Sequence, residues 1–275
     1  MPVLTFTSDI GRKDFLVGAV KGQILQVNDA LQLVDISHQL TPFNYPQAAY
    51  VCRNAIRNFP EETFHLIMVN LFDTKPEHLL LAHHNNQYIG IPDNGLLTMI
   101  LEEPPQEVVA IPLEKTQQKN TLYCAKIFAQ AFTDLLSGKK LSKVGDPKVS
   151  IQVKNPLRPL LGNNYIEGQI IFIDHFENVI VNITREEFEE QRRGRSFKVV
   201  FKRDEVIDKI SETYADVHEG EKLALFNSAG YLEIAINKGN AAGLFGLQGF
   251  AEVQASQAQI LQSRLFYQTV KVYFD

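Results

Sequence analysis

The sequence predicts two domains of different class. An α/β domain with a layered, mostly parallel sheet is expected over residues 1–150, and a smaller all-β, barrel-like domain over residues 160–275. Three observations support this. Apolar runs alternate with amphipathic stretches in the first half, a segment rich in Gly, Pro, Asn and Lys spans Gly145 to Asn164, and closely spaced β-rich runs dominate the remainder. The boundary is therefore expected near residues 145–160.

The first half alternates two kinds of hydrophobic pattern. Short runs rich in β-branched and large apolar residues predict strands at Val3–Thr7, Leu31–Ile36, Thr63–Val69, His78–His83, Gln87–Ile91 and Val108–Ile111. Longer stretches with apolar residues near helical spacing predict helices over Asp14–Val27, Pro46–Asn58, Leu96–Glu102 and Ala125–Leu136. Pro46 supports one of these helices because proline is favoured in a first helical turn. Strands that alternate with helices are typical of an α/β domain.

The second half reads as a series of short strands. They are expected at Gly168–Ile173, Val179–Ile183, Phe197–Phe201, Lys222–Phe226, Tyr231–Ile236 and Leu265–Phe274, with turn residues such as Ser228-Ala229-Gly230 between some of them. Strands at this spacing favour a small barrel or sandwich. The acidic run over residues 186–190 is followed by a basic run of Arg192, Arg193, Arg195 and Lys198. This mixed charge is interpreted as a solvated helix end or loop.

Composition excludes several classes of protein. The net charge is −5, whereas a nucleic-acid-binding protein usually carries a basic surplus. No segment approaches the roughly 20 apolar residues of a membrane-spanning helix, and the N-terminus lacks the pattern of a signal peptide, so we expect a cytoplasmic protein. Cys52 and Cys124 are too few and too far apart for a disulfide framework or a zinc site, and no metal site is expected.

Four polar segments follow apolar strands. They are Thr7-Ser8-Asp9-Ile10-Gly11, Asp35-Ile36-Ser37-His38, Pro92-Asp93-Asn94-Gly95 and Asp174-His175-Phe176-Glu177-Asn178. In open α/β sheets, ligands bind at the ends of strands. Each segment also has an ordinary structural explanation, as a helix cap, a loop contact or a β-turn. Taken singly, therefore, none of them identifies a function.

The order of these segments changes the interpretation. TSDIGRKD, VDISHQLTPF, IPDNG, IDHFEN and NSAGYLEIAINKGNAAG follow one another between roughly residues 3 and 253. In sequence and in order they resemble the blocks of the S-adenosylmethionine (SAM) hydroxide adenosyltransferase and chlorinase/fluorinase family. The resemblance implies an α/β N-terminal domain and a barrel-like C-terminal domain. It further implies a homotrimer in which SAM lies between the N-terminal domain of one subunit and the C-terminal domain of its neighbour.

The resemblance also implies roles for individual residues. Asp9 matches the carboxylate that binds the ribose diol through two charge-assisted hydrogen bonds. Phe43 can form one wall of the adenine slot, or it can be a core residue. The methionine moiety is assigned to the second half, at Asp174, Asn178, Asn227 and Ser228. SAM or adenosine is then the substrate or ligand, and no separate cofactor is expected.

The sequence departs from the family at the catalytic positions. The hydrolytic members use an Asp, an Arg and a His to activate water, which displaces methionine from ribose C5′. Here the Asp position is Asn70, the His position is Tyr123, and no Arg remains in the corresponding segment. An amide has no useful basicity, and an ordinary tyrosine is protonated at neutral pH. Asp73, Glu77 and His78 lie in the altered segment and are the candidates to compensate.

Three functions therefore stay open. The first is SAM hydrolysis to adenosine and methionine with a remodelled water site. The second is a non-catalytic module that binds SAM or adenosine. The third is halogenation, because the halide-using relatives also carry a tyrosine at the position of Tyr123. Against the third, the span from His78 to Pro92 lacks the insertion found in fluorinases.

Overall fold

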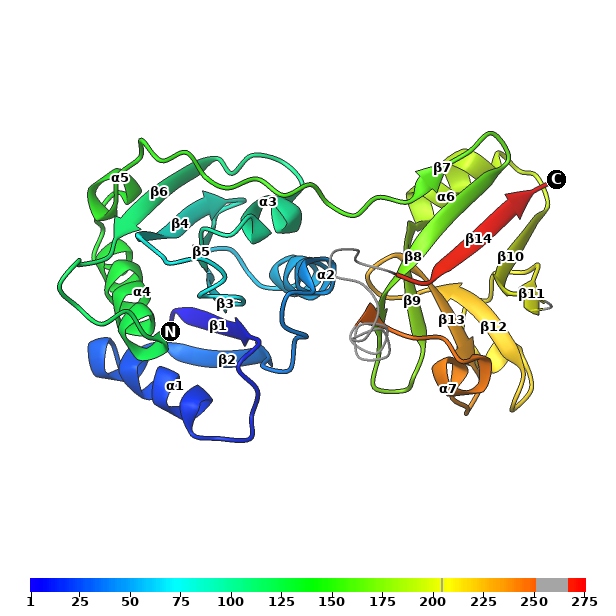
Figure 1. Cartoon of the computed structure of the whole chain (residues 1–275), viewed down its shortest axis with the longest axis horizontal. Coiled ribbons are helices and arrows are strands. Elements are labelled where there is room, and N and C mark those ends of the chain that lie inside the picture. Colours follow the sequence, from blue (N-terminus) through cyan, green and yellow to red (C-terminus); the bar gives the residue numbers. More distant parts are fainter. Residues whose placement is uncertain (204, 251–266) are drawn as a thin grey trace. The chain divides into compact units, whose positions relative to one another are not determined.

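The computed structural model describes residues 1–203, 205–250 and 267–275. Within it the chain forms two compact units, Met1–Pro156 and Leu157–Asp275 (Figure 1). The first is an α/β unit and the second is an antiparallel β unit that nearly closes into a barrel, so the predicted fold class is confirmed. Within the described ranges, no helix is both long and apolar enough to cross a membrane.

A six-stranded sheet forms the centre of the first unit, in the order β2-β1-β3-β5-β4-β6. The strands are β1 (Val3–Ser8), β2 (Gln32–Ser37), β3 (Phe64–Met68), β4 (His78–His84), β5 (Gln87–Pro92) and β6 (Glu107–Pro112). The pairs β1–β2, β1–β3 and β3–β5 are parallel, whereas β4 runs antiparallel to both of its neighbours. The sheet is thus mostly parallel.

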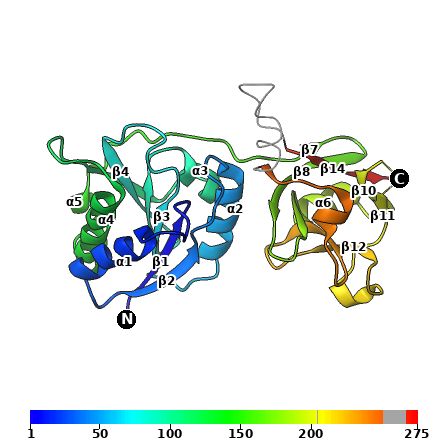
Figure 2. The ribbon, with the colours of Figure 1, turned by 60° about the horizontal axis from the view of Figure 1, so that its bottom comes forward.

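Helices cover both faces of this sheet (Figure 2). On one face, α1 (Leu16–Val27) packs against α4 (Thr121–Leu136), and on the other α2 (Tyr45–Ile56) packs against α3 (Leu96–Leu101). A short helix, α5 (Leu141–Val144), contacts β6 and α4. Side-chain caps begin the helices α2 and α4, where Asn44 accepts from the Gln47 N–H and Asn120 from the Tyr123 N–H.

Each face has its own apolar core. The α1/α4 face is filled by side chains such as Phe6, Phe128 and Phe132, and the α2/α3 face by Ile67, Leu80 and Ile91. Gly90 on β5 lets α4 approach the sheet, because a Cβ there would lie 2.7 Å from the rings of both Phe128 and Phe132. The alternation of faces along each strand thus explains why these strands read as continuous apolar runs.

The strand order creates a switch point. From β1 the chain moves to β2 on one side, and then crosses to β3 on the other side of β1. In open α/β sheets such a reversal opens a crevice at the carboxyl ends of the two central strands, here β1 and β3. The residues that directly follow these two strands therefore lie at the switch point.

The second unit is built on a sheet in the order β11-β10-β14-β8-β9-β13-β12, with β7 paired to β8. The strands are β7 (Leu160–Leu161), β8 (Tyr165–Ile173), β9 (Val179–Thr184), β10 (Phe197–Lys202), β11 (Glu205–Ile207), β12 (Lys222–Phe226), β13 (Tyr231–Ile236) and β14 (Thr269–Phe274). A bridge between Ile210 and Ala224 joins the two ends of the sheet, which leaves the barrel nearly closed. Its interior is a single apolar cluster that includes Phe188 and Phe274.

Some elements differ from the sequence-based expectation. The acidic run lies in a helix, α6 (Arg185–Arg192), which a capping box between Thr184 and Glu187 begins. Five short elements of the described chain were not expected, because each spans five residues or fewer: α5, β7, β11, the 3-10 helix η1 (Tyr214–Asp216) and the helix α7 (Ala241–Phe245). Of the expected strand Leu265–Phe274, residues 265–266 lie outside the described residues, and β14 begins at Thr269.

Candidate functional site

Asp9 and Asn70 meet at the switch point. Asp9 directly follows β1, Asn70 comes two residues after β3, and the Asn70 N–H donates to Asp9 Oδ2 at 2.9 Å. Burial raises the pKa of Asp9 above its ordinary value, and the backbone hydrogen bonds from Asn70 and Asp9 itself offset this only in part. The sheet thus places a partly desolvated carboxylate in the crevice where a ligand is expected.

Asn70 organises the loop around this carboxylate. Its backbone adopts a left-handed conformation (φ 49°), which asparagine tolerates better than most residues. Its Oδ1 accepts from the Phe43 N–H at 2.9 Å, which links the loop after β2 to the loop after β3. The Phe43 side chain is 56% exposed, so its ring lies at the surface and is not part of the core.

Tyr45 and Asp73 form a pair beside Asn70. The Tyr45 hydroxyl donates to Asp73 Oδ2 at 2.8 Å, and the Asp73 N–H donates to the Asn70 carbonyl at 3.1 Å. Lys154 Nζ lies 4.3 Å from the centre of the Tyr45 ring. Burial, then the hydrogen bond and charge of Asp73, and to a smaller degree the charge of Asp9, raise the pKa of Tyr45. The hydroxyl is therefore a proton donor at neutral pH.

His38 holds both sides of the Asp9 segment. Its ring is fully buried, with Nδ1 hydrogen-bonded to Ser8 Oγ at 2.8 Å, and its carbonyl accepts from the Gly11 N–H at 2.7 Å. On the other side of the ring, Nε2 lies 3.1 Å from Asp35 Oδ1. His38 thus fixes the segment around Asp9 by two hydrogen bonds, one to Ser8 before it and one from Gly11 after it.

Asp35 connects His38 to Lys21 on α1. Its Oδ2 accepts from Lys21 Nζ at 2.7 Å, and Arg12 lies 3.7 Å away. Burial lowers the pKa of His38 despite the nearby Asp35 carboxylate. For Asp35, burial is outweighed by the hydrogen bonds from Lys21 and His38, so its pKa falls below the ordinary value. The cluster thus contains a neutral imidazole and an ionised carboxylate at neutral pH.

The Pro92–Gly95 segment supports the loop after β3. The Asn94 side chain is buried, and its Nδ2 donates to the carbonyls of Val69 and Asn70 at 3.0 and 3.2 Å. Gly95 begins α3 with φ 86°, a conformation that a residue with a Cβ rarely adopts. Asp93 Oδ2 lies 2.9 Å from His78 Nε2. The residues Asn70, His78, Asp93 and Asn94 line part of a cavity of about 200 Å³.

Tyr123 is held elsewhere. Its N–H donates to the Asn120 side chain at 2.9 Å, and its hydroxyl accepts from the Glu114 N–H at 3.1 Å. Its ring packs against the α1/α4 core. Among the hydrogen bonds of the described residues, none joins Tyr123 to Asn70. The structure thus brings together Asp9, Phe43 and Asn70. Tyr123, the second predicted catalytic residue, is instead hydrogen-bonded to Asn120 and Glu114.

In the second unit, Asp174 and Asn178 form one turn between β8 and β9. Asp174 Oδ1 accepts from the N–H groups of Phe176 and Asn178, and Oδ2 accepts from Asn178 Nδ2 at 3.1 Å. Asn178 is buried. The described hydrogen bonds of Asp174 are thus made within its own turn.

Asn227 and Ser228 form the turn between β12 and β13. Asn227 Oδ1 accepts from the Ala229 and Tyr231 N–H groups at 3.0 and 3.1 Å. Glu233 on β13 is 3% exposed and accepts from the Tyr214 hydroxyl at 2.6 Å. Burial raises the pKa of Glu233, as does the charge of Asp174, while hydrogen bonds from Tyr214 and Asn227 oppose the shift.

Four of these residues were not selected from the sequence. They are Tyr45, Lys154, Tyr214 and Glu233. A polar aromatic residue at the start of a helix that faces the carboxyl edge is a signal that favours Tyr45. No comparable local signal indicates Tyr214 or Lys154, because each reaches its partner across a long separation in sequence.

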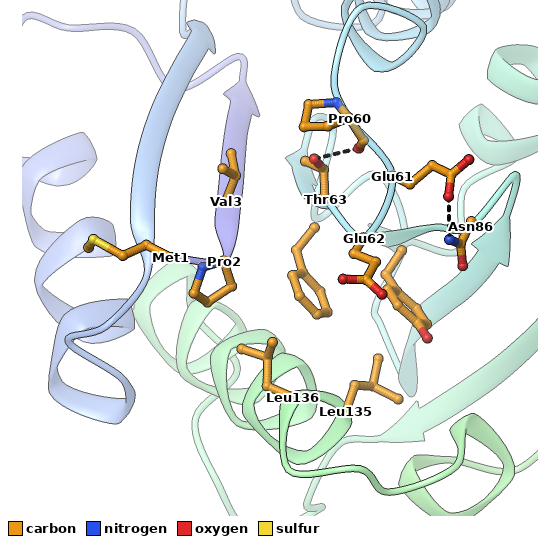
Figure 3. Close-up of a pocket in the computed structure, with 12 residues that line it drawn as sticks. Met1, Pro2, Val3, Pro60, Glu61, Glu62, Thr63, Asn86, Leu135 and Leu136 are labelled. Atoms are coloured by element: carbon orange, nitrogen blue, oxygen red, sulfur yellow. Dashed lines mark hydrogen bonds between the residues drawn. The ribbon is translucent and has the colours of Figure 1, made fainter.

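A cavity of about 540 Å³ lies at the opposite, amino edge of the parallel strands. Figure 3 shows that the start of β1, the loop before β3, the β4–β5 turn and the end of α4 surround it. Asn86 Nδ2 donates there to Glu61 Oε2 at 2.8 Å, and Thr63 Oγ1 to the Pro60 carbonyl at 2.7 Å. Its lining includes none of the residues that the sequence analysis selected.

A metal-ligand cluster or a reactive thiol would be an alternative kind of site among the described residues. Within them, no group of three or more His, Cys, Asp or Glu side chains is placed to hold a metal ion. Both cysteines are buried and free, and burial raises the pKa of Cys52 to about 12 and of Cys124 to about 11. Such thiols are protonated at neutral pH.

Comparison with known proteins identifies the family. The model of the SAM hydroxide adenosyltransferase N-terminal domain matches residues 4–145, and that of the C-terminal domain matches residues 168–254. The (R)-S-adenosyl-L-methionine hydrolase of Methanocaldococcus jannaschii is 26% identical over 92% of this chain and 95% of its own. A fluorinase of Nocardia brasiliensis is 30% identical over 92% of this chain and 96% of its own.

A solved structure agrees with these matches. The crystal structure of an uncharacterized conserved protein from Thermotoga maritima superposes with a TM-score of 0.81 at 27% identity, and covers 98% of this chain and 99% of that one. Matches to both domain models in chain order, together with full-length relatives, extend well beyond half of the sequence. The chain therefore belongs to the SAM hydroxide adenosyltransferase family.

Proposed function

We propose that this protein binds SAM and hydrolyses it to adenosine and L-methionine. The observation that carries the proposal is the position of Asp9, a partly desolvated carboxylate at the carboxyl ends of β1 and β3, in a chain whose full-length relatives include SAM hydrolases. A carboxylate can accept both hydroxyls of a ribose, and such charge-assisted hydrogen bonds are strong ones. Asp9 is the residue proposed to orient the ribose.

The proposed reaction is a displacement at ribose C5′. The oxygen of water forms a bond to C5′ while the bond from C5′ to sulfur breaks. The bonding pair goes to sulfur, so the sulfonium becomes the neutral thioether of methionine, and the attacking water loses one proton. Because the leaving group is neutral, no general acid is required. The protein has to align the water and exclude bulk solvent. SAM is the substrate in this scheme, and no cofactor or metal takes part.

Further residues are proposed to hold the rest of the substrate. The exposed ring of Phe43 provides an apolar face for adenine. Asp174 attracts the methionine ammonium, and Asn178, Asn227 and Ser228 surround the methionine carboxylate. We propose that the adenosine and methionine residues of one site come from different copies of the chain in a homotrimer. Light scattering tests this, since a stable mass other than three times that of the chain contradicts it.

A non-catalytic SAM-binding or adenosine-binding module is the second candidate. It is favoured by the amide at position 70 and by the hydrogen bond that engages the Tyr123 hydroxyl with Glu114. An amide has no useful basicity, and the Tyr123 hydroxyl oxygen already accepts a hydrogen bond. A halogenase is the third, because a fluorinase is among the full-length relatives. A halide needs hydrogen-bond donors and desolvation, but no base.

One experiment separates the three. Purified protein is incubated separately with the (S) and (R) sulfonium epimers of SAM in chloride buffer, because the hydrolase relatives are named for the (R) form. Chromatography then quantifies adenosine and chloroadenosine. Adenosine formed with turnover supports hydrolysis, and its loss in Asp9→Ala links the reaction to this site. Chloroadenosine supports the halogenase. Saturable binding with no product supports the binding module. If the protein neither binds SAM nor forms a product, none of the three functions is supported, and the family describes only the fold.

A further inference from the structure

We propose that Asp73, held by Tyr45, is the carboxylate that accepts the proton of the attacking water, in place of the acid that Asn70 has replaced. This inference rests on the proposed SAM hydrolysis and identifies the residues that would perform its proton transfer. Asp73 acts as the catalytic residue and Tyr45 as a positioning residue.

The loop after β3 places Asp73 beside the lost position. The Asp73 N–H donates to the Asn70 carbonyl at 3.1 Å, which closes a turn between the two residues. The Asn70 N–H in turn contacts Asp9 Oδ2 at 2.9 Å. One short turn therefore connects the ribose-binding candidate to a second carboxylate. A shift of the acid by three residues can compensate for the substitution because the chain reverses there.

Tyr45 defines the orientation of Asp73 from another element. Its hydroxyl donates to Asp73 Oδ2 at 2.8 Å from the first turn of α2. The raised pKa of Tyr45 keeps this hydroxyl protonated, so it remains a donor. A carboxylate has about four acceptor sites, so one bond from Tyr45 leaves capacity for a water.

The amide of Asn70 offers a complementary contact. Asn70 is 6% exposed, and its Nδ2 faces the Tyr45 hydroxyl, yet it meets no acceptor in hydrogen-bond geometry within the described part of the chain. A buried amide without a partner is destabilising, because its lost hydration is not replaced. A water whose oxygen accepts from Asn70 Nδ2 and which donates to Asp73 would remove this cost. Asn70 would then orient the nucleophile, and Asp73 would take its proton.

The charges also suit the substrate. The Asp73 carboxylate accepts from the Tyr45 hydroxyl, and the charges of Asp73 and Asp9 both raise the pKa of Tyr45, so two carboxylates lie near this hydroxyl. A sulfonium cation is attracted to such a site. In the reaction, one water proton moves to Asp73, the water oxygen joins C5′, and the C5′–S electron pair goes to sulfur. Proton release to solvent then restores Asp73.

The other candidates of this loop are engaged differently. His78 Nε2 lies 2.9 Å from Asp93, and the pair lines the cavity formed with Asn94. Glu77 lies between β3 and β4, where its carbonyl accepts from the Leu113 N–H. Neither has a described hydrogen bond to Asn70, Tyr45 or Asp9. Asp73 is thus the acid of this segment that the structure joins to the site.

The test compares three variants of the full-length protein, Asp73→Asn, Tyr45→Phe and Glu77→Gln. The last is the matched control, an acid-to-amide change in the same loop. We expect Asp73→Asn to lower kcat for SAM hydrolysis about 100-fold or more, the usual range for loss of a general base. Tyr45→Phe should lower it about fivefold, and Glu77→Gln less than twofold. Adenosine Kd, measured by calorimetry, should change less than threefold in all three.

Rescue provides a readout that a structural role would not affect. Formate added to Asp73→Ala should restore part of kcat in proportion to its concentration. An unchanged kcat in Asp73→Asn overturns the inference while wild-type turnover leaves the proposed hydrolysis standing. A parallel loss of adenosine binding in Asp73→Asn also overturns it, because the residue is then structural. Wild-type protein that binds SAM without turnover rejects both the hydrolysis and the base.

Discussion

The two units build their polar sites in different ways. In the β unit, the Asp174 and Asn227 side chains accept hydrogen bonds from N–H groups within four residues, so each turn is largely self-contained. In the α/β unit, Asp9 meets Asn70 across 61 residues and Tyr45 meets Asp73 across 28. Local turns remain intact when distant residues change. The α/β site depends on several loops together, so a change in one of them affects the others.

Asp9→Ala is the strongest test of the α/β site. It removes two proposed charge-assisted hydrogen bonds to the ribose, each worth about 1.5–3 kcal/mol. We expect adenosine affinity to fall at least tenfold in isothermal calorimetry. The β unit should retain its own fold in this variant, as judged by an unchanged β-sheet circular dichroism signal. An unaltered adenosine Kd would remove Asp9 from the proposed site.

Asp174→Asn tests the β unit by removing one charge. Asparagine can accept the two backbone hydrogen bonds through Oδ1, but its amide nitrogen loses the bond from Asn178 Nδ2, so the free energy of unfolding should fall by about 1 kcal/mol. The loss of charge should weaken binding of SAM about tenfold and leave adenosine binding unchanged, because only SAM carries the methionine ammonium. Titration of both ligands measures this. Equal effects on both ligands would place Asp174 outside the methionine site.

His38→Ala should weaken adenosine binding only indirectly, by displacing Asp9. It leaves Ser8 and Asp35 without the imidazole, at an expected cost of about 1–3 kcal/mol in the free energy of unfolding. Displacement of Asp9 should weaken adenosine binding about fivefold, with kcat reduced in proportion. His38→Gln, which keeps a polar side chain of similar length, should recover part of both. Urea unfolding and calorimetry are carried out on both variants. If His38 acted only by packing in the core, glutamine would restore neither the stability nor the adenosine affinity.

The smallest expected effects concern two carboxylates at the same edge. Burial raises the pKa of Asp9, so stability declines as pH rises through the titration of this group, and Asp9→Asn should raise the unfolding midpoint slightly at pH 7. The pKa of Asp35 is lowered, because its hydrogen bonds from Lys21 and His38 outweigh burial. Its contribution is present at pH 7 and is lost as pH falls through its folded-state pKa.

Asp35→Asn should therefore lower the midpoint at pH 7, with a difference that shrinks toward acid pH. Thermal unfolding of both variants between pH 3 and pH 7 measures the two signs. Midpoint shifts of the same sign in the two variants would contradict the expected contrast. In that contrast burial destabilises the ionised Asp9 carboxylate, whereas Lys21 and His38 stabilise the ionised Asp35 carboxylate.

Much of the fold follows from local pattern. The strands of the α/β unit begin and end within one or two residues of the expected ranges, since buried strands and amphipathic helices have distinct periodicities. The short elements β11, η1 and α7 were missed because they are too brief to show a period. Asp9 and Asp174 could be selected because each stands in a short motif of contiguous residues. Glu233 could not, since its partner Tyr214 lies 19 residues away, and the position of Tyr45 at a helix start does not indicate its partner Asp73, which lies 28 residues away.

The sequence by itself determined the two fold classes, the mostly parallel sheet and the family resemblance, because periodicity, turn residues and short motifs are properties of neighbouring residues. Only the tertiary structure decided that β1 and β3 are adjacent, that Asn70 therefore contacts Asp9, and that Asp73 is hydrogen-bonded both to Tyr45 and to the Asn70 carbonyl. The physical reason is that strand order and loop closure bring together side chains that no local rule relates. The chemistry of this protein depends on those long-range contacts.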